Sequence, residues 1–220
     1  MVALASKPIA QIVIPMFSGP DLDAFATRIQ AVIADLAAKK PCGWIVDLRG
    51  NGGGNIWPMM AGVGPILGEG EPGGVMYGAT TNKWFYEEGK AGSREDKHDP
   101  YYAKTNGEPV KLNGTPPVAV LIDRETGSSG EGIAVAFRGR PDTRFFGEAT
   151  FGAATSTFPI KLSDGAQIYL VTGVMVDRHG AEYPLGIKPD QEILSDLSIT
   201  TNDPVIRAAS DWLSAQNGCR

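Results

Sequence analysis

The sequence predicts an α/β fold in which helices alternate with the strands of a largely parallel sheet. Two observations predict it. An apolar strand, a turn and a helix follow one another at the N-terminus, and a strand, a glycine-containing turn and a helix return in the second half. The size fits, because 220 residues with 42% apolar side chains are enough to bury the core of one domain. We therefore expect a single domain that spans residues 1–220.

The N-terminal segment predicts a β-α-β unit. Residues 9–14 are mostly apolar and β-branched, as expected of a strand. Apolar residues then recur at helical spacing over residues 22–36, and Pro41 ends the helix because proline cannot continue it. Residues 44–46 form a short apolar run, which predicts a buried strand that leads into Asp47.

A glycine-rich turn and a second helix follow. The turn covers residues 50–54, and residues 56–67 are apolar on nearly every side, which predicts a buried helix. Residues 74–77 and 83–86 predict short strands. Residues 87–109 are polar, rich in charge and glycine, and without a period, so we expect a long loop of the kind that is often functional.

The second half repeats the order of strand, turn and helix. Residues 117–122 are a continuous apolar run, and residues 128–137 carry their apolar residues on one helical face. Further short strands are expected at residues 143–146, 157–160 and 167–172. Asp203 followed by Pro204 predicts the cap of a last helix that runs through Ala215.

Composition excludes several classes of protein. The net charge is −5 and the 20 Lys and Arg residues are scattered, so a nucleic-acid-binding surface is not expected. No apolar run approaches the roughly 20 residues of a membrane span, and no basic segment followed by an apolar stretch predicts a signal peptide. Two cysteines, Cys42 and Cys219, can form neither a framework of several disulfides nor a Cys-rich zinc site.

Two turns carry residues suited to chemistry, and each follows the carboxyl end of a predicted strand, where sites form in parallel sheets. The first, DLRGNGGG at residues 47–54, has glycines that can aim backbone N–H groups into a cleft. The second, TGSSGE at residues 126–131, places Ser128 and Ser129 where a helix begins, so free N–H groups face any developing negative charge. Taken singly, the turns are explained as a strand-to-helix connection and a helix cap, and only their convergence favours an active site.

Nucleotide cofactors are not expected at the first turn. It lacks the Lys-Ser or Lys-Thr pair of a P-loop, and Asn55 or Trp57 stands where the dinucleotide fingerprint needs its third glycine. We therefore expect no cofactor and no metal.

The order and spacing of the motifs resemble those of the S41 serine peptidases, the C-terminal processing and tail-specific proteases and their relatives. Residues 47–54, 126–131 and 147–152 carry the resemblance. Similarity extends through residues 55–59, 137–141 and 186–190, so it covers roughly residues 9–193. The chain looks most like the nisin-resistance-protein-like branch.

The resemblance implies a ClpP/crotonase-like β-α superhelix and a serine hydrolase that cleaves peptide or ester bonds through an acyl-enzyme. It places the nucleophile at Ser128 and the oxyanion donors at the backbone N–H groups of Ser129 and Gly53. It also implies a peptide or small ester as substrate. Relatives carry an N-terminal cap, and tail-specific proteases carry a PDZ domain, and we expect neither here. Relatives are mostly exported bacterial proteins. The sequence is compatible with more than one cellular location and with a homo-oligomer.

The chain departs from the family pattern where a proton acceptor is needed. The resemblance implies a base that is either a lysine directly after Thr-Phe-Gly, as in many S41 members, or a histidine upstream of the first strand. Here Ala153 stands at the lysine position, and no histidine precedes residue 9. His98 in the expected long loop, His179 in an expected turn and Glu182 are the weak candidates for a general base.

Two other functions stay open because of this departure. The chain could be a catalytically impaired fragment or binding module that lacks its base. It could also be a crotonase-like enzyme that binds an acyl-CoA, although that reading gives no reason for the TGSSGE motif.

Overall fold

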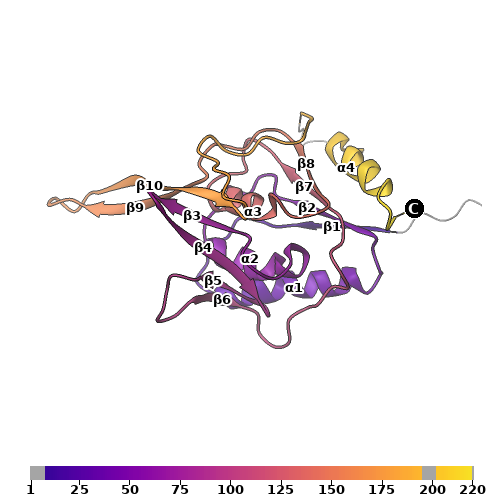
Figure 1. Cartoon of the computed structure of the whole chain (residues 1–220), viewed down its shortest axis with the longest axis horizontal. Helices are drawn as coiled ribbons and strands as arrows, with labels where there is room; N and C mark the ends of the chain where they lie inside the picture. The colour runs from indigo at the N-terminus through magenta and orange to yellow at the C-terminus, as the bar shows by residue number, and fades with distance from the viewer. Residues whose placement is uncertain (1–7, 195–201, 220) are drawn as a thin grey trace, which may run out of the picture.

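The computed structural model describes residues 8–194 and 202–219, which form a parallel sheet and an antiparallel sheet (Figure 1). Within the described part, helix α4 lies on one face of the parallel sheet, and helices α1, α2 and α3 lie between the two sheets. The prediction of an α/β fold is confirmed.

The parallel sheet is built from apolar strands that are covered on both faces. Its order is β1 (Ile9–Val13), β2 (Gly43–Asp47), β7 (Val118–Ile122), β8 (Thr143–Gly147) and β11 (Gln191–Glu192). Every residue of the central strands β2 and β7 is buried, which explains why the sequence shows continuous apolar runs there instead of an alternation. All carboxyl ends of these strands therefore meet at one edge.

Two hydrophobic clusters hold the helices to this sheet. Helices α1 (Leu22–Ala37), α2 (Ile56–Leu67) and α3 (Ser129–Phe137) pack against Trp44, Val46 and Val120 on one face. Helix α4 (Pro204–Ser214) packs on the other face. There Leu213 contacts Ile45 and the strand residues that alternate with those of the first face. Helix α2 has the predicted bounds, and α4 begins after its predicted cap.

The antiparallel sheet corrects one expectation. Its order is β6 (Tyr101–Lys104), β5 (Lys90–Ser93), β4 (Thr80–Glu87), β3 (Gly73–Tyr77), β10 (Gln167–Asp177) and β9 (Thr155–Lys161). Residues 87–109, expected to be one long loop, contain β5 and β6. These strands have only four residues each, and their small buried side chains, Ala91 and Ala103, pack on the core instead of producing an apolar period.

Strands β9 and β10 leave the body of the molecule as a long hairpin (Figure 1). Its side chains are largely exposed, including Phe158 at 62% and Tyr169 at 63%. The hairpin begins beside the two turns singled out in the sequence, since Thr155, Ser156 and Thr157 lie in the same groove as Ser128. Among the described residues, no helix has the length and hydropathy that a membrane crossing requires.

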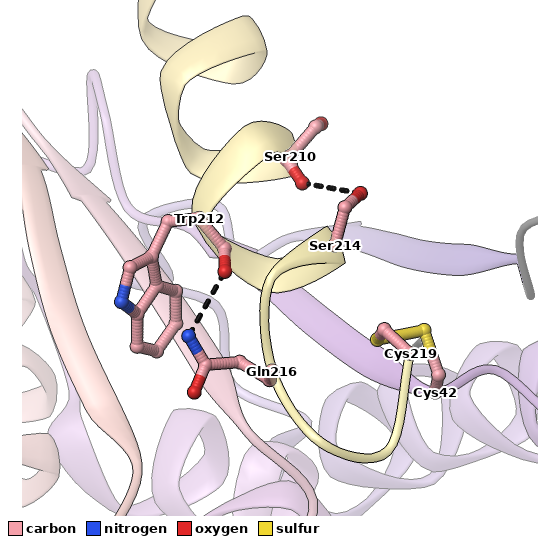
Figure 2. The surroundings of a disulfide bond; sticks show 6 residues. All are labelled: Cys42, Ser210, Trp212, Ser214, Gln216 and Cys219. Carbon is pink, nitrogen blue, oxygen red and sulfur yellow. Dashed lines mark hydrogen bonds between the residues drawn. A yellow bond between two sulfur atoms is a disulfide. The ribbon is translucent and has the colours of Figure 1, made fainter.

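A disulfide bond joins Cys42 to Cys219 across 177 positions of sequence (Figure 2). It connects the segment after α4 to the residue before β2, and Gln216 Nε2 donates to the carbonyl oxygen of Trp212 at 2.9 Å in the same turn. Two cysteines cannot form a framework of several disulfides, as expected, but this single bridge was not predicted from the sequence. Nothing in the spacing of two distant cysteines indicates that a helix brings them together.

Because this bridge closes a long loop, replacing both cysteines by serine is expected to lower the free energy of unfolding by about 2 to 4 kcal/mol. The corresponding fall in Tm is roughly 4 to 16 °C for a domain of this size, measured by calorimetry without reductant. Dithiothreitol should lower the Tm of the wild type and leave that of the double variant unchanged. Equal Tm values for the oxidised wild type and the double variant would contradict a stabilising role.

Candidate active site

The two turns meet at the edge of the parallel sheet where β2 and β7 end. The N–H of Gly127 donates to the carbonyl oxygen of Asn51 at 2.9 Å. A Cβ atom added to Gly53 would lie 2.8 Å from the Cβ of Ser128 and 2.9 Å from the nitrogen of Ser129. Only glycine fits such an approach, and the predicted convergence of residues 47–54 and 126–131 is confirmed.

Asn51 shapes the glycine-rich turn from inside. Its side chain is 1% exposed, and its Nδ2 donates to the carbonyl oxygen of Ile14 at 2.9 Å. Its Oδ1 accepts from the N–H of Gly53 at 3.0 Å, and Gly53 has a φ of +110°. The N–H of Gly53, expected to be an oxyanion donor, is therefore held by Asn51 here. Within the described part of the chain, no group accepts from the N–H of Gly54.

Ser128 stands at the start of α3 in a conformation that L-residues rarely adopt. Its φ is +51° and its ψ is −119°, and the residue is exposed. Ser129 follows as the first helical residue, and no described group accepts from its N–H. Its hydroxyl donates to the carbonyl oxygen of Gly54 at 2.6 Å, a further link between the turns. The positive end of the α3 dipole therefore faces the Ser128 side chain.

A buried carboxylate, that of Glu131, holds the turn at residues 126–131, which we call the serine turn. Glu131 is 0% exposed, and its Oε2 accepts from the N–H groups of Ser128 and Ala153, both at 2.8 Å. Its Oε1 accepts from the Thr150 hydroxyl at 2.6 Å and from the N–H of Gly152 at 2.9 Å. Four donors offset the cost of burying the charge. The backbone N–H of Ala153 thus shares a carboxylate oxygen with the backbone N–H of Ser128.

A groove of about 430 Å³ opens in front of Ser128 and Ser129. The beginning of α2 and the antiparallel sheet form its other walls, with Trp57, Trp84 and Met175 as apolar lining. None of the described residues that line it carries a formal charge. The groove therefore suits an extended, uncharged segment of a ligand.

The three weak candidates for a general base lie elsewhere. His98 is exposed in the connection between β5 and β6, where its backbone N–H donates to Asp96 Oδ1 at 3.0 Å. His179 Nε2 lies 3.2 Å from the carbonyl oxygen of Gly139. Glu182 is exposed and pairs through its backbone with β10. None of the three is among the described residues that line the groove.

An ion-pair cluster attaches the first turn to α4. Arg49, with a side chain 5% exposed, contacts Asp47 Oδ2 and Asp203 Oδ2, each at 2.7 Å. Burial lowers the pKa of Arg49, but the hydrogen bonds and charges of both aspartates outweigh it and raise that pKa. For Asp203, burial raises the pKa, while Arg49 and the N–H groups at the start of α4 bring it below its usual value. Sequence reasoning found Asp203 only as a helix cap.

Comparisons with known proteins agree on one family. Peptidase family S41 matches residues 8–193. The chain is 30% identical over 211 residues to the nisin-resistance protein of Lactococcus lactis subsp. lactis, covering 92% of this chain and 59% of that protein. It is 26% identical to the carboxy-terminal processing protease CtpA of Bacillus subtilis, covering 96% of this chain and 40% of CtpA. The chain thus spans less than two thirds of either relative.

Solved structures show the same fold. A lipoprotein from Streptococcus agalactiae superimposes with a TM-score of 0.69 at 26% identity, covering 96% of this chain and 68% of that one. The photosystem II D1 C-terminal processing protease gives a TM-score of 0.61 at 20% identity, covering 83% of this chain and 42% of that one. The second likeness concerns the fold alone.

The backbone strain at Ser128 is testable without activity. Ser128→Gly removes the Cβ atom that disfavours a positive φ, whereas Ser128→Ala keeps it. We expect the glycine variant to be more stable than the alanine variant by about 1 kcal/mol, the strain relieved less the entropy of glycine. Urea unfolding of both variants measures this difference. An alanine variant at least as stable as the glycine variant would contradict the strained conformation.

The cluster at Arg49 predicts a pH dependence of stability. Because the folded-state pKa of Asp203 is lowered, its contribution is present above the unfolded-state value of about 3.9 and is lost as pH falls through the folded value. Asp203→Asn keeps a helix cap but loses the charge, so we expect it to cost about 2 kcal/mol at pH 7. The difference from wild type should vanish well below pH 4, as measured by urea unfolding across that range.

Asp211→Asn provides the control for that series, because Asp211 is exposed on the same helix. Its substitution should change stability little at any pH. A cost of Asp203→Asn that stays constant from neutral to acidic pH would show that the charge is not the cause.

Proposed function

Because this chain belongs to peptidase family S41, we propose that it is a serine hydrolase whose nucleophile is the hydroxyl of Ser128. The family is one of peptidases, and both the activity of this chain and the residue roles are our proposal. The observation that carries the assignment is the position of Ser128, exposed at the start of α3 and in contact with the glycine-rich turn. An alcohol there faces backbone donors and the positive end of a helix.

Hydrolysis would proceed through an acyl-enzyme. The Ser128 oxygen attacks the substrate carbonyl carbon while its proton passes to a general base, and the carbonyl oxygen becomes an oxyanion. Collapse of this intermediate expels the amine or alcohol, which takes up the proton held by the base, and leaves the acyl group on Ser128. Water then gives a proton to the base and attacks the ester, and release of the acid returns that proton to the Ser128 oxygen.

The proposed oxyanion donors are the backbone N–H of Ser129 and an N–H of the glycine-rich turn. Ser129 supports this role because no described group uses its N–H. Gly53 remains the proposed second donor, and it must share or release its bond to Asn51 Oδ1 when substrate binds. Gly54 is the neighbour with a free N–H among the described residues. Each such donor contributes on the order of 3 kcal/mol to the transition state.

The substrate class follows from the groove. An uncharged cleft lined by Trp57, Trp84 and Met175 favours a peptide segment with uncharged side chains. Because the cleft is open, small activated esters can also reach Ser128, so we propose esterase activity as a second form of the same chemistry. The resident general base is not part of the proposal. Ala153 replaces the family lysine, and the relatives extend beyond the matched segment.

The competing hypothesis is a binding module that has lost catalysis. Its motivation is Ala153 and the position of His98 and His179 away from the groove. The exposed Ser128 and its open backbone donors favour the hydrolase instead. The hypotheses differ in whether Ser128 reacts.

A fluorophosphonate probe separates them. We expect covalent labelling of the folded wild type, together with slow hydrolysis of p-nitrophenyl acetate, and loss of both in Ser128→Ala. Ser214→Ala, at a serine on α4 far along the chain from both turns, is the matched control and should label like the wild type. Labelling no stronger than that of heat-denatured protein, or undiminished in Ser128→Ala, would reject the hydrolase.

A further inference from the structure

We propose that Asp123 is a positioning residue that holds the glycine-rich turn and the serine turn in register. The proposal deepens the proposed function, since it concerns the same two turns. Asp123 is the first residue after β7, and its side chain is buried, with 2% of the residue exposed. Asp123 is not among the residues that line the groove, and the reaction steps proposed above do not use it.

The carboxylate of Asp123 accepts hydrogen bonds from both turns. The N–H of Gly50 lies 3.1 Å from its Oδ1 and 3.2 Å from its Oδ2. From its own turn, Oδ1 accepts the N–H of Glu125 at 3.0 Å and the N–H of Thr126 at 2.9 Å. The N–H of Gly50 thus binds a carboxylate 73 positions away in sequence, which also binds the serine turn.

Thr126 completes the connection. Its hydroxyl lies 3.1 Å from Asp123 Oδ1 and donates to the carbonyl oxygen of Leu48 at 2.9 Å. The backbone N–H of Asp123 also donates to this hydroxyl at 3.1 Å, so Asp123 contacts a second group that links the serine turn to Leu48, just before the glycines. Gly53 follows Gly50 by three residues, and Ser128 follows Thr126 by two. Moving the Asp123 carboxylate is therefore expected to displace both Gly53 and Ser128.

Asp123 forms no ion pair with the described residues, and its carboxylate accepts from backbone N–H groups of both turns. The backbone aims these donors, so removing their acceptor leaves N–H groups of both turns without it: the N–H of Gly50 in a part-buried position and the N–H of Thr126 in a buried one. The turns would then separate or rotate. A displacement of about 1 Å between nucleophile and oxyanion donors costs on the order of 100-fold in rate.

The substitution that tests the proposal is Asp123→Ala, compared with Asp177→Ala as a matched control. Asp177 is similarly buried at 7% exposure and accepts from His179 N–H, Ala181 N–H and the Tyr183 hydroxyl in the turn after β10. Both variants lose a buried acceptor with several donors, so both should lose stability. Only Asp123→Ala should lose reactivity at Ser128.

The readout is the rate of fluorophosphonate labelling per folded molecule, with the folded fraction taken from near-ultraviolet circular dichroism. We expect Asp123→Ala to label at least about 10-fold more slowly than wild type, and Asp177→Ala to stay within about 3-fold. Asp123→Asn keeps an oxygen at the Oδ1 position and should restore most of the rate. Equal losses in the two alanine variants would overturn the proposal.

Amide hydrogen exchange gives an answer even if the wild type is not labelled, in which case the proposed function fails by itself. Asp123→Ala should accelerate exchange in peptides from both residues 48–55 and residues 124–130, while Asp177→Ala leaves both unchanged. Faster exchange confined to residues 124–130, or none, would overturn the role of Asp123 as a link between the turns.

Discussion

The candidate site depends on buried acceptors that hold irregular backbone in place. The residues after β2 and β7 cannot satisfy their N–H groups within helix or strand, and an unpaired buried N–H is costly. Asn51, Asp123 and Glu131 accept these donors from inside the protein. Because Asn51 is held by the carbonyl oxygen of Ile14, Asp123 directly follows β7 and Glu131 lies in α3, the close approach of Gly53 to Ser128 is part of the folded framework.

The order of the strands explains why such a site lies where it does. Strands β2 and β7 are neighbours in a parallel sheet, so their carboxyl ends come together although the sequence separates them by a helix and several strands. Helices α2 and α3 start close to that edge with their positive ends toward the groove. The antiparallel sheet closes the opposite wall and brings uncharged side chains to it. Geometry and electrostatics at Ser128 thus follow from topology.

Local sequence patterns predicted the parts of this framework that bury apolar runs. Residues 56–67 were predicted as a helix with the observed bounds, and the two turns were singled out because each follows a predicted strand of a parallel sheet, whose carboxyl ends meet at one edge. The strands within residues 87–109 were missed because their pairing with β4 comes from tertiary packing and not from a period. The links Arg49 to Asp203 and Cys42 to Cys219 each join residues more than 150 positions apart, and no local signal marks such partners.

The bridge between Cys42 and Cys219 also changes how the molecule can come apart. Helix α4 makes its main contacts with the parallel sheet through one apolar face, and terminal helices usually fray from the free end. Here that end is covalently tethered beside β2, while Asp203 at the other end is held by Arg49. Neither end can peel away first, so α4 is expected to detach only when the sheet beneath it opens, which makes it part of the last cooperative unit to unfold.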